Sequence, residues 1–86
     1  MSYEIDSEIV IGILRVLKSC GGYPMRENLL FTEYNSTAMT VQTMSAIREH
    51  LQHAKDKGWT DFIVDEIDRS KKWFITTEGK VLLQNR

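Results

Sequence analysis

The hydrophobic period of this sequence changes once, at Gly58, and that change limits the folds open to the chain. Before Gly58, apolar residues recur three and four positions apart, which is typical of helices that bury one face. After it, the segments 59–67 and 73–76 are rich in aromatic and β-branched residues, which favour strands. A chain of 86 residues holds about one domain. We therefore expect one domain over 1–86, in which helices and a short sheet share a core.

Three helices are expected in the first part of the chain. The first is predicted over 6–19, where it ends before a pair of glycines. The second is predicted over 24–32, because Pro24 suits the first turn of a helix and the polar segment 35–37 breaks the apolar pattern.

The third helix is the longest and is predicted to end at Gly58, since a glycine commonly follows the last turn. Thr37 or Thr40 is expected to cap its start. Its inward face, at about 100° per residue, is formed by Val41, Met44, Ile47, Leu51 and Ala54.

The two strand-like segments are joined by the polar stretch 68–71, which suits a hairpin turn. In the second segment, Trp73 and Ile75 alternate onto the same face, so we expect them to cover the helices. Thr76 or Thr77 then caps a short final helix. The predicted fold class is mainly α with a β-hairpin (α+β).

This order of elements resembles the winged helix-turn-helix domain: a three-helix bundle, a two-stranded wing and a short C-terminal helix. The stretch KDKGW (55–59) is similar to the family's junction between helix and wing. The stretch KKWFITTEGKVLL (71–83) is similar to its aromatic–x–aliphatic–Thr–x–x–Gly ending. The corresponding residues here are Trp73, Ile75, Thr76 and Gly79. The resemblance indicates fold more specifically than function, because winged helices also serve as protein-interaction modules.

The resemblance implies that the third helix enters the major groove of DNA. Its outward face carries Gln42 and Ser45, which can hydrogen-bond base edges, but also the acids Glu49 and Asp56. Docking by the N-terminal half of the helix avoids most of the repulsion between these acids and phosphates. The DNA contacts expected in this region are Thr40, Gln42, Thr43, Ser45, Arg48 and Arg26.

The densest positive cluster is 69–72, at the expected tip of the wing, where Arg69, Lys71 and Lys72 could contact DNA phosphates. Asp65, Glu66 and Asp68 stand just before it. Charge pairing across the hairpin is therefore the alternative interpretation of the same residues.

Other chemistry has little support in the sequence. There is no glycine-rich phosphate loop and no HExxH motif, so we do not expect an enzyme. His50 and His53 lie three residues apart on the third helix, but a structural zinc site needs four ligands and the only thiol is Cys20. Histidines beside a polar face are usually solvated, so no metal and no cofactor is expected.

We therefore predict a small DNA-binding protein, a transcriptional or phage- and mobile-element-type regulator whose partner is double-stranded DNA. The alternative is a non-catalytic protein-interaction module on the same fold. The formal net charge of -1 means that any contact with DNA depends on a local patch. The N-terminus 1–6 lacks a basic region and no apolar run approaches the roughly 20 residues that span a bilayer, so a cytoplasmic location without membrane contact is expected.

A homodimer is expected, since one such module buries only about 600–1,000 Å² on DNA. Strand alternation places Phe74 on the face opposite Trp73, where it is predicted to form the dimer contact. In the alternative, Leu82 or Leu83 covers Phe74 within one chain.

Overall fold

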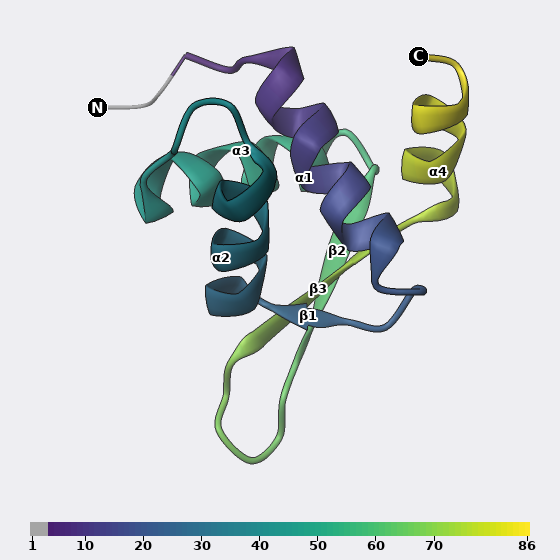
Figure 1. The fold of residues 1–86 in the computed structure, drawn as a ribbon. Helices are drawn as coiled ribbons and strands as arrows, with labels where there is room; N and C mark the ends of the chain where they lie inside the picture. Colours follow the sequence, from purple (N-terminus) through teal and green to yellow (C-terminus); the bar gives the residue numbers. More distant parts are fainter. Residues whose placement is uncertain (1–3) are drawn as a thin grey trace.

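Within the described residues, 4–86, the computed structural model of the protein contains four helices and a three-stranded antiparallel sheet (Figure 1). The order is α1 (Ser7–Ser19), β1 (Met25–Arg26), α2 (Glu27–Thr37), α3 (Met44–Asp56), β2 (Thr60–Val64), β3 (Lys71–Ile75) and α4 (Thr77–Gln84). The fold is α+β, as predicted. No helix in the part of the chain that the structure describes is long and apolar enough to cross a bilayer. Residues 1–3, part of the N-terminal segment without a basic region, lie outside the described residues.

Helix α1 is the centre of the core and contacts α2, α3, α4 and β3. The carboxylate of Asp6 caps its start by accepting a hydrogen bond from the backbone N–H of Glu8. Ile13, Leu14 and Leu17 on this helix are fully buried. The predicted helix 6–19 is therefore confirmed to within a residue.

The sheet has the order β1-β3-β2, so β3 is its central strand. Trp73 lies in the middle of β3, opposite Met25 on β1 and opposite Phe62 on β2. It is only 3% exposed, and its ring packs against Phe62 with the ring centroids 4.9 Å apart. Together with the buried Ile75, this confirms that one face of the second wing strand covers the helices.

The predicted second helix, 24–32, is wrong at both ends. Pro24 precedes a two-residue strand, β1, which pairs with β3 and adds a third strand to the two-stranded wing expected from the sequence. The polar segment 35–37 does not break the helix but forms its last turn. The hydroxyls of Ser36 and Thr37 donate to backbone carbonyls one turn earlier, which satisfies these polar side chains inside the helix.

The start of the third helix also differs from the prediction. Neither Thr37 nor Thr40 is its cap; the side chain of Thr43 accepts the hydrogen bond from the backbone N–H of Ala46. Val41, expected on the inward face, lies in the preceding loop and is 71% exposed. Ala46, which is absent from the predicted inward face, is buried. Both errors follow from starting the helix several residues too early.

His50 is buried rather than solvated. Its Nε2 accepts a hydrogen bond from the backbone N–H of Asp6 at 3.1 Å, and its Nδ1 lies 2.7 Å from the carbonyl oxygen of Ala46. Because Nε2 accepts, Nδ1 is the ring nitrogen that donates to this carbonyl. His50 therefore joins α3 to the start of α1.

The wing is the β2–β3 hairpin with its loop, 65–70, and it projects from the helices at the bottom of Figure 1. The first strand is shorter than predicted, since it ends at Val64, and Ile67 stands in the loop at 94% exposure. At the other end of β3, Thr76 caps α4 by accepting from the N–H of Gly79, as predicted.

Candidate nucleic-acid interface

Two neighbouring lysines of the wing lie on opposite faces of the sheet. Residues alternate along β3, so Lys71 shares a face with Trp73, and Lys72 shares the other face with Phe74. The Lys71 ammonium lies 4.8 Å from the centroid of the Phe62 ring, on the side of the sheet that faces α3. The positive cluster 69–72 is therefore divided by the strand between two surfaces.

On the α3 side, an open cleft of about 480 Å³ separates the helix from the wing. We call it the α3–wing cleft. It brings together two predicted DNA contacts, Arg48 on α3 and Lys71 on β3. Its full lining is Glu27, Arg48, Gln52, Ser70, Lys71 and Trp73.

Glu27, at the start of α2, orients the cationic side of this cleft. One carboxylate oxygen accepts a hydrogen bond from the Trp73 indole N–H at 3.1 Å, and the other accepts from Nε of Arg48 at 3.1 Å. A buried tryptophan thus fixes Glu27, and Glu27 holds Arg48. The ion pair uses only Nε, which leaves the two terminal nitrogens of the guanidinium able to donate to a further acceptor.

The chemistry of the cleft suits a phosphate group. Arg48 and Lys71 supply two positive charges, and the one lining carboxylate, that of Glu27, is already hydrogen-bonded through both oxygens. Gln52 and Ser70 add neutral groups that can donate hydrogen bonds. An arginine held in one orientation beside a lysine is an arrangement that favours a bound phosphate oxygen.

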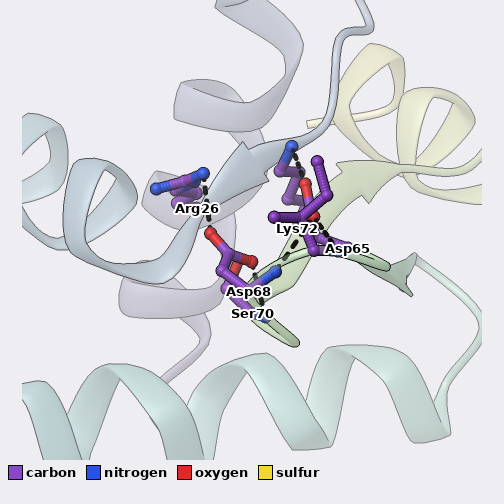
Figure 2. A network of polar contacts seen from close by, with 6 residues as sticks. Arg26, Asp65, Asp68, Ser70 and Lys72 are labelled. Atoms are coloured by element: carbon purple, nitrogen blue, oxygen red, sulfur yellow. Dashed lines mark hydrogen bonds and ion pairs between the residues drawn. The ribbon is translucent and has the colours of Figure 1, made fainter.

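Two aspartates organise the wing loop (Figure 2). Asp65 accepts hydrogen bonds from the backbone N–H groups of Ile67 and Asp68, and its other oxygen pairs with Lys72 at 2.8 Å. Asp68 accepts from both the N–H and the hydroxyl of Ser70 and pairs with Arg26 at 2.8 Å. Two residues predicted to contact DNA, Arg26 and Lys72, therefore have partners inside the protein. The pair of Lys72 with Asp65 is the charge pairing within the hairpin that was the alternative interpretation.

These hydrogen bonds lower the pKa of both carboxyl groups. The hydrogen bond from Lys72, followed by those from the backbone, lowers the pKa of Asp65 from its ordinary 3.8 to about 2. The bonds from Ser70, with a smaller contribution from Arg26, lower the pKa of Asp68. Both groups are ionised at neutral pH, which keeps the loop network intact.

Arg69 is the remaining predicted DNA contact on the wing, and it follows Asp68 in the loop. Its φ is 63°, a left-handed conformation that costs energy for a residue with a Cβ. Its backbone N–H donates to the carbonyl of Asp65, which closes the loop around this conformation.

The four residues predicted at the start of the third helix do not line the α3–wing cleft. Thr40 and Gln42 face a separate groove beside α1, Thr43 uses its hydroxyl oxygen as the cap of α3, and Ser45 is exposed on the first turn. The side chain of Asn35 accepts from the Gln42 N–H and donates to the Gln42 carbonyl. This paired contact fixes the loop between α2 and α3.

Sequence reasoning missed Glu27 and Asn35 as positioning residues. Glu27 was visible only as a favourable charge in the first turn of a helix, because its partners Trp73 and Arg48 are distant in the chain. Phe74 is half-buried on the other face of the sheet, opposite Asp61 on β2. In the described residues, no group of three or more metal-binding side chains comes together.

The bundle of α1–α3, the three-stranded sheet and the projecting hairpin together make this a winged-helix fold. Two crystal structures share it, each 22% identical in sequence to this chain. One, from Thermoplasma acidophilum and provisionally named a transcriptional regulator, has a TM-score of 0.73 over 93% of this chain and 75% of its own. The other, from Ralstonia eutropha and provisionally named a DNA-binding protein, has a TM-score of 0.72 over 95% of this chain and 96% of its own. No protein-family model matches the sequence, and no curated protein is similar to it.

Proposed function

We propose that this protein binds double-stranded DNA as a winged-helix regulator of transcription. The observation that carries the proposal is the α3–wing cleft, where Glu27 holds Arg48 opposite Lys71. The provisional names of the two similar structures point the same way. In this arrangement the outer face of α3 lies in the major groove, and the cleft holds the phosphate backbone that borders it.

The proposed DNA contacts differ from those predicted from the sequence, because some of the predicted cations act only indirectly. Arg48 and Lys71 contact phosphates, and Ser45, which is exposed on the first turn of α3, hydrogen-bonds a base edge. Arg26 and Lys72 act indirectly, because their ion pairs hold the wing loop in shape.

Binding of a fluorescent duplex tests the proposal. The wild type is expected to bind at low salt, and Lys71→Gln to bind less tightly, because the variant can no longer pair with a phosphate at this position. Lys80→Gln is the matched control: it removes the same charge from an exposed position on α4. Equal weakening by the two variants would mean that only net charge matters and that the cleft is not the site.

A second candidate function is a non-catalytic protein-interaction module. The acids Glu49 and Asp56 are exposed on α3, and Met39 and Ile67 are almost fully exposed apolar residues in two loops. Such apolar side chains occur at protein interfaces. The same binding experiment separates the two functions, since this candidate predicts no affinity of the wild type for any duplex at low salt.

We propose in addition that the protein is a homodimer with Phe74 in the contact. Phe74 lies half-buried on the face of the sheet opposite to that of Trp73. Sedimentation velocity is expected to give a dimer for the wild type and a folded monomer for Phe74→Ser. A wild type that is monomeric at high concentration would contradict the dimer, and an unfolded Phe74→Ser would place Phe74 in the core of one chain.

A further inference from the structure

A small cavity lies where the start of α1, the end of α3 and the C-terminal helix α4 meet. Its volume is about 160 Å³. Ile5, Val10 and Ile11, at the start of the chain and on α1, form the apolar part of its wall together with Leu82 of α4. The cavity shares no lining residue with the α3–wing cleft, so the proposed function gives it no role.

Two aromatic rings form another part of the wall. His53 lies in the last turn of α3, and Trp59 follows the end of that helix. Their ring centroids are 6.2 Å apart and their planes meet at 65°, an edge-to-face arrangement that fixes both rings relative to each other. An apolar cavity of about 150 Å³ is large enough to hold one benzene ring. The size and the aromatic wall of this cavity therefore suit a ligand with a single flat ring.

The polar side chains that line the cavity can all donate hydrogen bonds. They are the Ser7 hydroxyl, the His53 imidazole, the Trp59 indole N–H and the Arg86 guanidinium, which is always positively charged. Within residues 4–86, none of these four side chains makes a hydrogen bond or an ion pair. No acidic side chain in the same part of the chain lines the cavity. The cavity therefore suits a ligand that supplies hydrogen-bond acceptors and a negative charge.

We propose that this cavity binds a small aromatic carboxylate. The ring of the ligand packs against Trp59 and the apolar wall, where its burial favours binding. The carboxylate of the ligand faces Arg86 and His53, because a charged guanidinium forms its strongest hydrogen bonds with a carboxylate. The inference does not rest on the proposed function, since none of these residues belongs to the α3–wing cleft.

The experiment titrates the full chain with benzoate and follows the indole N–H signals of its two tryptophans by NMR, with no DNA present. The Trp59 signal is expected to shift and to saturate with a Kd of about 1 mM, because so small a ligand makes few contacts. The Trp73 signal, whose N–H is bound to Glu27 outside the cavity, is expected to stay unchanged. Benzamide, which has the ring without the charge, is expected to bind severalfold more weakly, and acetate, which has the charge without the ring, to give no saturable shift.

Arg86→Gln tests the placement of the carboxylate. This variant is expected to bind benzoate severalfold more weakly and benzamide as before, whereas Arg15→Gln, the control at an exposed arginine on α1, is expected to bind both like the wild type. A Trp59 signal that does not saturate with benzoate would overturn the site. Equal affinity of the wild type for benzoate and benzamide, or equal weakening of benzoate binding by the two variants, would overturn the assignment of a carboxylate to Arg86.

Discussion

At the scale of single residues, Trp73 has two roles that one side chain combines. Its ring fills the space between the sheet and the helices, and its indole N–H fixes Glu27, which in turn holds Arg48. The stability of the fold and the geometry of the proposed phosphate site therefore depend on the same residue.

Trp73→Ala is expected to reduce the free energy of unfolding by about 3–5 kcal/mol, because it leaves a cavity in the core. That loss is close to the whole stability of a small domain, so the variant is expected to be largely unfolded in thermal melts. Trp73→Phe keeps most of the packing and loses the hydrogen bond to Glu27, so a loss of only about 1–2 kcal/mol is expected. An unchanged melting temperature in Trp73→Ala would show that the ring is not in the core.

Gly79 is a second position where one atom decides stability. A Cβ added there would lie well inside van der Waals contact of the Trp59 carbonyl oxygen and close to the Ile75 side chain. Alanine is favoured over glycine inside a helix by about 1 kcal/mol, but the clash with backbone cannot be relieved by a side-chain rotation. We expect Gly79→Ala to lower the melting temperature, and Lys80→Ala, its neighbour on the exposed face, to leave it nearly unchanged. A stabilised Gly79→Ala would contradict this packing.

At the scale of elements, the wing loop depends on ionised aspartates. Because the folded-state pKa of Asp65 lies below its ordinary value, the contribution of this network to stability is complete above about pH 4. It is lost as the pH falls through about 2, the pKa of Asp65 in the folded protein.

An NMR titration of the Asp65 carboxyl carbon is expected to give a midpoint near 2 rather than 3.8. The amides of Ile67 and Asp68, which donate to this carboxylate, are expected to shift over the same range. Asp65→Asn removes the titrating group and is expected to abolish these amide shifts. A midpoint at the ordinary value would mean that the ion pair with Lys72 does not form in solution.

Sequence patterns predicted the elements whose stability is local. Helix α1 and the cap of α4 at Thr76 follow from apolar spacing and a suitable hydroxyl, both of which can be recognised in the chain itself. Strand β1 has only two residues, too few for any period, and exists because Met25 pairs with Trp73 far along the chain. The end of α2 resembles a loop in the sequence because it is polar. Its hydroxyls donate to carbonyls one turn earlier, which allows the helix to continue.

At the scale of the whole molecule, the sequence predicted only part of the α3–wing cleft. The prediction grouped Arg69, Lys71 and Lys72 by their closeness in the chain, but alternation along β3 sends Lys71 and Lys72 to opposite faces, and the register decides which of them faces α3. A shift of one residue exchanges those faces, and the sequence alone left the register open. The link from Trp73 through Glu27 to Arg48 needed the folded chain, since it joins three separate elements.

Because the net charge of the molecule is close to zero, the contribution of each cation to DNA affinity depends on where it lies. With 11 basic and 12 acidic residues, the protein as a whole does not attract DNA, so affinity must come from the few cations that reach phosphates. In the proposed account these include Arg48 and Lys71 in the α3–wing cleft.

The salt dependence of DNA affinity reports how many phosphates the cations of the α3–wing cleft contact. Arg48→Gln combined with Lys71→Gln is expected to reduce the slope of log affinity against log salt by about 2, since each cation that neutralises a phosphate adds about one unit to that slope. Arg15→Gln combined with Lys80→Gln changes the net charge equally at exposed positions on α1 and α4 and is expected to leave the slope unchanged. Equal slopes for the two double variants would contradict the assignment of DNA binding to the α3–wing cleft.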